Sequence, residues 1–372
     1  MPSPIDIAAI QNCVSNTVAQ DAGVHDRLFA GVIGDAPSHY SKSPGLWNAT
    51  FRHLDMNAVY LPFDVDDARV GELLAVLRKS ECFLGANVTV PHKVRVIDFL
   101  DELDPGAARI QAVNTIVRAP DGRLVGYNTD GEGFIESLLQ HQPDRTESFI
   151  SSLKGLTVLL LGAGGSARAV AFHVADKLDG GRLIICNRTV EHAISLCGEI
   201  QNGASMAIAI DEGELTNWAP KAGLIINSTT KGQGGIRKLA GGTATLLESY
   251  SALAPAHPPV LAAADLEPAD FARNWAEAAR SDVERNNQTS MNLAKSIPQA
   301  VPFYDLIYHP EETVFLRHGR MTGHPTMNGK AMIVNQAVIA FCERICRTQL
   351  QAKGIDTQET RGQILEIMYR AW

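Results

Sequence analysis

A glycine-rich segment, 162–167, is the strongest indication of chemistry in this sequence. It closes an apolar run over 157–162 and opens a helical pattern over 165–178. In that context G-x-G-x-x-A indicates dinucleotide binding rather than a plain turn. Its residues are Gly162, Ala163, Gly164, Gly165, Ser166 and Ala167. Gly162 permits a tight turn, Gly164 lets the backbone approach a pyrophosphate, and Ala167 lets the helix pack closely on the strand. We expect the first amides of the helix to face the phosphates.

The end of the next expected strand, 182–187, indicates which dinucleotide binds. Asn187, Arg188 and Thr189 stand there, where an NAD enzyme usually has an Asp or Glu that accepts from the ribose 2′-hydroxyl. No carboxylate is present to repel a 2′-phosphate, and the planar guanidinium of Arg188 suits one. Asn187 and Thr189 add hydrogen-bonding groups. The sequence therefore favours NADP over NAD.

Four short polar clusters follow expected strands in the first third of the chain, where open α/β sheets bind their ligands. They are SKSP at 41–44, NVTVPHK at 87–93, AVNT at 112–115 and GYNTDG at 126–131. Each has an ordinary explanation when taken alone. The serines can cap a helix, the lysine can be solvated, and the aspartate can cap the helix after it. All four in this order, followed by the glycine-rich turn and Asn-Arg-Thr, are hard to obtain by chance.

With these motifs the chain resembles the shikimate dehydrogenase family, including its relatives that use quinate. The resemblance covers about residues 28–235 and resumes over 303–345, and it includes the segments 227–229, 304–308 and 332–336. It implies an α/β fold with an N-terminal α/β substrate domain, a Rossmann NADP-binding domain and a C-terminal helix that returns to the first domain. The domains expected are an N-terminal extension (1–27), the substrate domain (28–130), the Rossmann domain (131–328) and C-terminal helices (329–372).

The resemblance also implies roles for individual residues. Ser41 and Ser43 correspond to the hydroxyl groups that bind the substrate carboxylate, and Tyr308 to a tyrosine that helps close the site around it. The positions that would hold ring hydroxyls are Thr89, Asn114, Asp130 and Gln336. Those that would contact the cofactor beyond the glycine-rich turn and Asn-Arg-Thr are Ser228, Thr229 and Gly329, the last beside the nicotinamide ring.

Lys93 and Asp130 look like the catalytic pair of this family. Oxidation of a secondary alcohol removes its proton as hydride leaves the same carbon. An ammonium beside a carboxylate can relay that proton and stabilise the developing charge. Charge pairing and desolvation have opposite effects on a lysine, so the sequence leaves open which of the two accepts the proton.

Strand and helix patterns alternate along the chain and predict largely parallel α/β sheets. In the first half, strands are expected over 28–34, 58–64, 85–90 and 112–117, and helical segments over 45–54, 68–80 and 93–100. After a polar stretch at 141–152, further strands are expected over 157–162, 182–187, 206–210 and 223–228, with helices over 165–178 and 190–200. The segment 236–300 lacks a clear strand, so we expect an insertion with a helix over 270–280 and otherwise mobile chain. Helical patterns return over 329–345 and 357–372.

Composition disfavours several classes of protein. Among 372 residues, 33 Lys and Arg oppose 41 Asp and Glu, and this net charge of −8 disfavours nucleic acids and anionic membranes as partners. No apolar run approaches the length of about 18 residues that a membrane-spanning helix needs. Six scattered cysteines fit reduced, mostly buried thiols in a cytoplasmic protein. No motif indicates a metal site.

The leading hypothesis is an NADP-dependent shikimate dehydrogenase, a monomer or homodimer that reversibly reduces 3-dehydroshikimate. A quinate/shikimate dehydrogenase, or a paralogue acting on a related cyclic hydroxy acid, stays open. Two features keep this alternative open: the expected insertion at 236–300, and Lys330, which stands where the family typically has Leu. A non-catalytic module that senses shikimate or quinate ranks lower, because Lys93 and Asp130 are both present.

Overall fold

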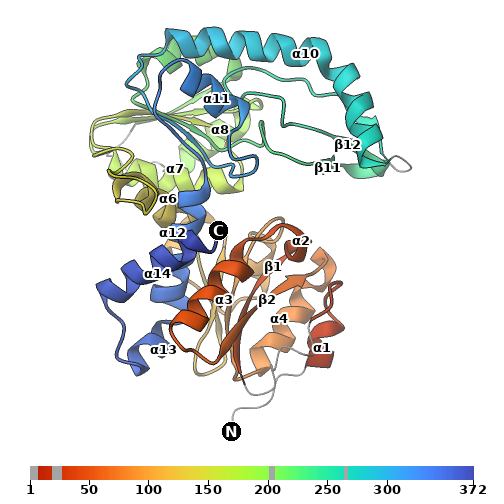
Figure 1. The fold of residues 1–372 in the computed structure, drawn as a ribbon, viewed down its shortest axis with the longest axis vertical. Coiled ribbons are helices and arrows are strands. Elements are labelled where there is room, and N and C mark those ends of the chain that lie inside the picture. Colours follow the sequence, from red (N-terminus) through yellow and green to blue (C-terminus); the bar gives the residue numbers. More distant parts are fainter. Residues whose placement is uncertain (1–6, 19–26, 201–205, 264–266) are drawn as a thin grey trace. The chain divides into compact units, whose positions relative to one another are not determined.

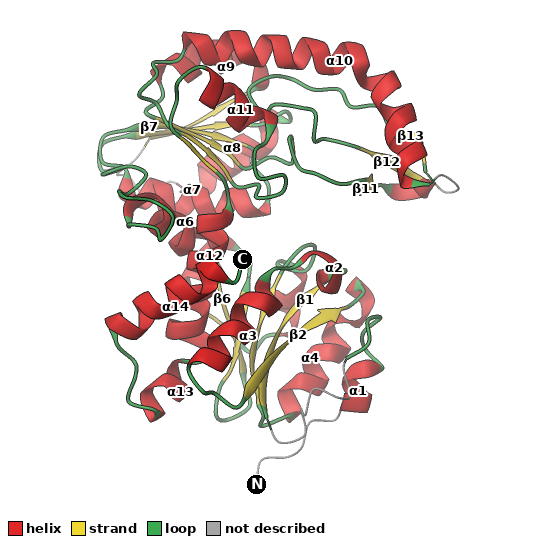
Figure 2. Ribbon diagram, in the orientation of Figure 1, coloured by secondary structure: helices red, strands yellow, loops and turns green. Residues whose placement is uncertain are grey.

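The computed structural model describes residues 7–18, 27–200, 206–263 and 267–372, and it divides into two compact units (Figure 1). The first unit contains the described residues up to Ser137, together with His141–Glu147 and Ile333–Trp372. The second contains Leu138–Gln140 and the described part of Ser148–Met332. In each unit helices lie on both sides of the strands (Figure 2), which confirms the expected α/β class.

The first unit is built on a six-stranded sheet in the order β2-β1-β3-β5-β6-β4. Its strands are β1 (Leu28–Gly34), β2 (Ala58–Asp64), β3 (Phe83–Val88), β4 (Glu102–Leu103), β5 (Thr115–Arg118) and β6 (Leu124–Tyr127). β1 and β2 have the expected bounds, and β1 is parallel to both β2 and β3. β5 is antiparallel to β3 and β6. The sheet is therefore mixed rather than largely parallel, because the turn residues Ala-Pro-Asp-Gly at 119–122 close a hairpin between β5 and β6.

Short helices connect these strands, and the C-terminal helices belong to the same unit from Ile333 onward, as α6 does up to Ser137. They are α1 (Ile7–Gln11), α2 (Pro37–Tyr40), α3 (Ser43–His53), α4 (Val70–Lys79), α5 (Pro105–Ile110), α6 (Asp130–Leu139), α12 (Lys330–Ile339), α13 (Arg347–Ala352) and α14 (Gln358–Arg370), with a π-helical segment at Ala340–Ile345. The segment expected to be helical over 93–100 forms a 3-10 helix at Arg95–Phe99. The carbonyl of Lys93 already accepts from Val113 N at 2.7 Å, and Ile97 N bonds the carbonyl of Val94. The tighter three-residue pattern of a 3-10 helix results.

The described part of the N-terminal extension is integrated into the first unit. Apolar side chains between residues 7 and 18 join the buried core of the sheet. Asn16 bonds the edge strand β2 through both ends of its amide, accepting from Asp64 N at 2.8 Å and donating to the Pro62 carbonyl at 3.0 Å. This segment thereby covers backbone groups that an edge strand would otherwise leave unpaired.

The second unit contains a parallel sheet in the order β15-β14-β10-β7-β8-β9. Its strands are β7 (Thr157–Leu161), β8 (Arg182–Cys186), β9 (Met206–Ile210), β10 (Leu224–Asn227), β14 (Phe303–Asp305) and β15 (Thr326–Met327). Its main helices are α7 (Gly165–Lys177), α8 (Val190–Ile200), α9 (Leu215–Trp218), α10 (Pro268–Ser296) and α11 (Val314–Met321). The central strands are almost wholly buried, as expected when helices cover both faces of a parallel sheet. This is the Rossmann arrangement that the glycine-rich turn predicts.

The segment 236–300 has more regular structure than the expected helix over 270–280 with otherwise mobile chain. The 29-residue helix α10 extends far beyond the expected 270–280, and β11 (Arg237–Lys238), β12 (Thr243–Thr245) and β13 (Leu261–Ala262) form a small antiparallel sheet. Phe271 and Trp275 of α10 pack into a core with Tyr250. Farther along the helix the buried positions are polar: the amide of Asn286 donates to the carbonyls of Ser251, Ala254 and Pro255. An apolar periodicity therefore does not reveal this half of the helix. Residues 264–266 lie outside the described part.

Two further findings concern the whole described chain. All six cysteines are free thiols with buried side chains, which confirms the expected burial. No helix in the described ranges combines the length and apolar character needed to cross a membrane.

Candidate active site and cofactor-binding turn

Lys93 and Asp130 meet in the first unit. Lys93 follows β3 and Asp130 is the first residue of α6. Lys93 Nζ lies 2.6 Å from Asp130 Oδ2, with the side chains 21% and 7% exposed. A short ammonium–carboxylate contact that is largely shielded from water fixes the positions of both groups. Part of the Lys93 side chain stays accessible to solvent. The pair has the geometry for passing a proton to or from an alcohol.

Asn114 supports the other oxygen of the aspartate. Its Nδ2 donates to Asp130 Oδ1 at 2.8 Å and lies 3.3 Å from Gln336 Oε1. The orientation of the Asn114 amide is set by Thr129, whose backbone N–H donates to Asn114 Oδ1 at 2.8 Å. The structure thus brings together four of the residues singled out in the sequence: Lys93 after β3, Asn114 directly before β5, Asp130 at the start of α6 and Gln336 of α12. It also brings in Thr129, which sequence reasoning did not assign.

The two serines lie at the junction of α2 and α3. Ser43 is the first residue of α3, and the N-cap position is occupied by Lys42, without a capping side-chain hydrogen bond among the described residues. Ser41 Oγ accepts from the backbone N of Ser43 at 3.2 Å. Both serines are half-buried. The ordinary explanation of this motif, a serine at the N-cap position of α3, therefore does not hold.

Thr89 and Tyr308 belong to different units. Thr89 is half-buried directly after β3, and its backbone N donates to the Ile33 carbonyl at 2.9 Å. Tyr308 is half-buried in the second unit, and burial raises the pKa of its phenol. The tyrosine therefore keeps its hydrogen at neutral pH and is a donor for an anionic group.

The glycine-rich turn has the backbone shape that a pyrophosphate requires. Gly162 has φ +108°, and a Cβ there would lie 2.7 Å from Ser228 Oγ. Gly164 and Gly165 are exposed, and no described heavy atom lies within 4 Å of a Cβ built on either. No side chain in the described ranges caps α7, whose N-cap is Gly164, so its first amides stay available to an anion. Ala167 is fully buried against the sheet. Ala163 and Ser166 are half-buried beside the turn.

Asn187, Arg188 and Thr189 follow β8. The side chain of Asn187 donates to the carbonyl of Thr189 at 2.8 Å and shapes this short loop. Arg188 is exposed and makes no hydrogen bond or ion pair with any residue that the structure describes. Its guanidinium is therefore available for a phosphate.

Ser228 and Thr229 are held at the end of β10 by a buried polar network. Ser228 Oγ donates to the Leu161 carbonyl at 2.6 Å, and Thr229 donates to Asn227 Oδ1 through both N (2.9 Å) and Oγ1 (2.7 Å). Asn227 in turn donates to Asp305 Oδ1 at 3.0 Å. Asp305 also accepts from Thr313 Oγ1 at 2.6 Å. This carboxyl was not singled out in the sequence, where it is one residue of a recognised segment without an assigned role.

Asp305 makes the second unit sensitive to pH. Burial raises the pKa of Asp305 to about 7 against the hydrogen bonds that favour its anion. A raised folded-state pKa contributes stability that is complete below the unfolded value near 4 and is lost as pH rises through about 7. Asp305→Asn, which cannot ionise, should therefore gain stability relative to wild type by up to about 1.4 kcal/mol per pH unit between pH 4 and 7.

Urea unfolding of both proteins across this range measures the difference. Glu277→Gln, an acid-to-amide change at an exposed position of α10, is the matched control and should track wild type. A constant difference between Asp305→Asn and wild type at every pH would contradict the prediction.

The packing of the neighbouring backbone requires a glycine at position 329. A Cβ there would lie 2.0 Å from the carbonyl oxygen of Leu306, and Gly329 N donates to the Ile307 carbonyl at 3.0 Å. Close backbone packing thus accounts for this glycine in the second unit, whether or not a nicotinamide also lies against it.

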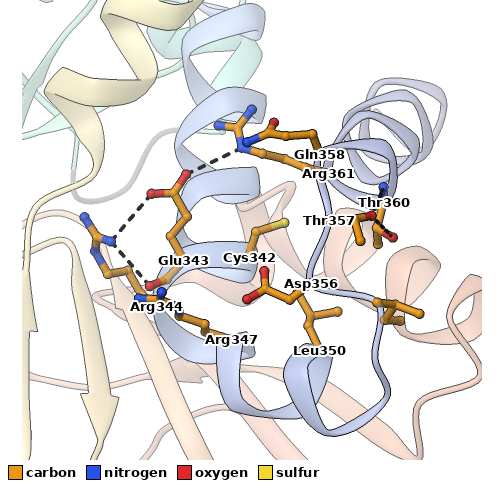
Figure 3. Close-up of a pocket in the computed structure, with 11 residues that line it drawn as sticks. Cys342, Glu343, Arg344, Arg347, Leu350, Asp356, Thr357, Gln358, Thr360 and Arg361 are labelled. Atoms are coloured by element: carbon orange, nitrogen blue, oxygen red, sulfur yellow. Dashed lines mark hydrogen bonds and ion pairs between the residues drawn. The ribbon is translucent and has the colours of Figure 1, made fainter.

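The C-terminal helices brace α6, the helix that begins with Asp130. Arg361 Nη2 of α14 lies 2.8 Å from both carboxylate oxygens of Glu136. Arg361 also lines a cavity of about 420 Å³ formed by the last helical segments, where Glu343 lies between Arg361 and Arg344 (Figure 3). Arg344 reaches Glu132 at 3.4 Å. Two arginines from the C-terminal region thus anchor successive turns of α6.

Removing one of these anchors should destabilise the first unit. In Arg361→Leu the half-buried carboxylate of Glu136 loses its cation, and the free energy of unfolding should fall by about 2 kcal/mol. Arg370→Leu on the same helix is the control: Arg370 is 80% exposed and 3.6 Å from Glu366, so its loss should cost less than about 0.5 kcal/mol. Urea titrations compare the two variants, and equal midpoints would contradict the bracing role.

Other candidates for chemistry have structural roles or are absent. His92 is buried, and its Nε2 bonds the Val65 carbonyl at 2.8 Å. Across the described ranges, no group of three or more His, Cys, Asp or Glu side chains is arranged to hold a metal ion.

Comparison with known proteins identifies the family of this chain. Residues 32–116 match the family model for the shikimate dehydrogenase substrate binding domain, and residues 144–239 match that for shikimate / quinate 5-dehydrogenase. The shikimate dehydrogenase (NADP(+)) of Lysinibacillus sphaericus is 34% identical over 315 residues, 85% of this chain and 91% of the relative. That of Desulforamulus reducens is 35% identical over 310 residues, 82% and 86% of the two chains.

Solved structures have the same fold. The shikimate 5-dehydrogenase of Thermus thermophilus, in complex with NADP(H) and shikimate, superposes with a TM-score of 0.61 at 26% identity, covering 93% of this chain and 100% of that one. The expected resemblance is confirmed over most of the sequence: this chain belongs to the shikimate dehydrogenase family.

Proposed function

We propose that this protein is an NADP-dependent dehydrogenase that interconverts shikimate and 3-dehydroshikimate. The observation that carries the proposal is the 2.6 Å contact between Lys93 and Asp130, supported from behind by Asn114. Relatives named as NADP-dependent shikimate dehydrogenases, at 34% and 35% identity, support the same assignment. The described part of the first unit is the proposed substrate domain, and that of the second unit is the proposed NADP domain.

The residues of the first unit have complementary tasks in this reaction. In the direction of oxidation, Lys93 and Asp130 take the proton of the alcohol while its carbon gives up hydride and the C–O bond becomes C=O. When bound, NADP supplies the hydride acceptor. Asn114 holds the aspartate. Asn114 and Gln336 would offer amide groups to ring hydroxyls, and Thr89 its hydroxyl.

The carboxylate of the substrate is assigned to the serines. Ser41 and Ser43 are hydroxyl groups at a helix start, where an anion also gains from the helix dipole. A quinate-using enzyme is the second candidate. Quinate carries an additional hydroxyl on the carbon that bears the carboxylate, and a pocket discriminates only weakly against one added hydroxyl.

The cofactor is assigned to the second unit on two grounds. The open space beside Gly164 and Gly165 accommodates a pyrophosphate at the uncapped start of α7. The exposed guanidinium of Arg188 would take the 2′-phosphate. Buried free thiols support a reducing, cytoplasmic location.

Steady-state assays with shikimate and quinate, each with NADP and NAD, test the proposal. We expect the highest kcat/KM for shikimate with NADP. A clear preference for quinate with NAD would overturn the choice of both substrate and cofactor. Tight binding of shikimate without turnover would instead indicate a sensing module.

A further inference from the structure

Lys231 closes the turn that follows β10 in the second unit. We call residues 227–231 the β10 turn. Lys231 N donates to Thr229 Oγ1 at 3.1 Å, and the Lys231 carbonyl accepts from Asn227 Nδ2 at 3.2 Å. The backbone of Lys231 is therefore part of the same small network that holds Ser228 and Thr229.

The β10 turn packs on the glycine-rich turn. Ser228 donates to the Leu161 carbonyl through both N and Oγ, at 2.8 and 2.6 Å. A Cβ built on Gly162 would lie 2.7 Å from Ser228 Oγ and 3.2 Å from Thr229 Cγ2. A displacement of the β10 turn would therefore change the packing around the first glycine of the proposed pyrophosphate site.

The side chain of Lys231 connects the β10 turn to two other segments of the second unit. Its ammonium contacts Glu212 Oε1 and donates to the Ala254 carbonyl at 2.7 Å. Glu212 begins a 3-10 helix, Glu212–Glu214, that follows β9. The side chains of Lys231 and Glu212 are only 12% and 15% exposed, so water screens this ion pair much less than it screens a surface pair.

Helix α10 fixes the loop that supplies the Ala254 carbonyl. Asn286 of this helix is buried and donates to the same carbonyl at 3.1 Å. It also bonds both backbone groups of Ser251, accepting from N at 2.8 Å and donating to the carbonyl at 3.1 Å. A continuous set of hydrogen bonds therefore runs from α10 through Ala254 and Lys231 to the β10 turn.

We propose that Lys231 is a positioning residue for the dinucleotide, whose side chain holds the β10 turn against the glycine-rich turn; this inference rests on the proposed function. A binding turn that is already in place loses less conformational entropy when its ligand binds. The pyrophosphate is common to NADP and NAD, so loss of the Lys231 ammonium should weaken the binding of both cofactors equally. In this respect Lys231 differs from Arg188, whose proposed partner is the 2′-phosphate.

Lys231→Met, which keeps the aliphatic chain and removes the ammonium, tests this role. It should raise the dissociation constants of NADP and NAD about fivefold each. At saturating NADP, kcat and the KM for shikimate should stay within about twofold of wild type, because Lys93 and Asp130 belong to the first unit. Unchanged affinity for both cofactors, or a loss confined to NADP, would contradict the role.

The double variant Lys231→Met/Glu212→Gln separates positioning from folding. Lys231→Met alone leaves the mostly buried carboxylate of Glu212 without its cation, which should lower the melting temperature. The double variant carries no unpaired charge there and should recover most of the melting temperature. Its dissociation constants should nevertheless stay at the values of Lys231→Met. Recovery of cofactor affinity together with the melting temperature would show that Lys231 contributes only to stability.

Lys154→Met is the matched control. Lys154 is an exposed lysine that precedes the amino end of β7 and lies 2.6 Å from Asp179, whereas the β10 turn follows the carboxyl end of a parallel strand. The control loses an ion pair of the same unit, yet both cofactors should bind it with the affinity of wild type. An equal loss of affinity in Lys154→Met and Lys231→Met would reject a specific role of Lys231.

Calorimetric titration with NADP in the absence of shikimate keeps this inference apart from the proposed function, because it measures binding without turnover. Equal dissociation constants for NADP in wild type and Lys231→Met would overturn the Lys231 role alone. A wild-type protein that binds NADP but does not oxidise shikimate would overturn the proposed function alone.

Discussion

Replacing Lys93 by alanine should lower kcat for shikimate oxidation by about a hundredfold or more. The variant removes the ammonium that lies 2.6 Å from Asp130 and leaves a largely buried carboxylate without its cation. The proton of the alcohol then has no relay, and charge that develops on the oxygen is no longer stabilised. Steady-state kinetics with saturating NADP and shikimate measure the effect.

Lys79→Ala provides the control for this experiment. Lys79 is an exposed lysine at the end of α4 in the same unit, and its removal should leave kcat within about twofold of wild type. NADP should bind Lys93→Ala with unchanged affinity, which would show that the second unit is intact. Near-normal turnover in Lys93→Ala would remove this residue from the mechanism.

Replacing Arg188 by alanine should raise the KM for NADP about 30-fold while the KM for NAD changes by less than about threefold. The guanidinium is exposed at the end of β8, without an ion-pair partner in the described part of the chain. Its charge-assisted hydrogen bonds would be made only to the 2′-phosphate, which NAD lacks. The ratio of kcat/KM for the two cofactors measures this preference directly.

Arg182→Ala is the matched control for Arg188→Ala. Arg182 is an exposed arginine at the opposite end of the same strand, β8, and should affect neither cofactor. Equal losses with NADP and NAD in Arg188→Ala would reject a 2′-phosphate role and would point to a general effect on the loop that Asn187 shapes.

Sequence patterns located the strands and helices that have a clear pattern of apolar and polar residues. The strands at 28–34 and 58–64 are bounded as expected, because their apolar β-rich runs end at turn residues. The pattern failed for α10, where the buried Asn286 and Ser290 are polar. Asn286 donates to backbone carbonyls of a distant loop, and Ser290 bonds the side chains of Ser251 and His318. It also missed β6, because a short hairpin strand carries little periodicity of its own.

The candidate site also contains residues that local motifs identify and residues that they do not. Lys93, Asp130 and the glycine-rich turn stand in short ordered motifs, so each was singled out from local sequence. Asp305 was not, although it ends a short strand whose residues are all buried. A carboxyl group beside apolar strand residues is a signal that could have found it, yet that signal does not identify the hydrogen-bond partners.

The sequence by itself determined the family, the α/β class and the side chains available for chemistry, because these depend on residue types at short spacings. Only the tertiary structure decided which side chains share a hydrogen bond across 27 or 37 positions of chain, as Tyr60 does with Asn87 and Lys93 with Asp130. It also raises the pKa of Asp305 to about 7, since burial is a property of the packed unit. Long-range contacts arise from the pairing of strands and helices, and no local pattern encodes their distances.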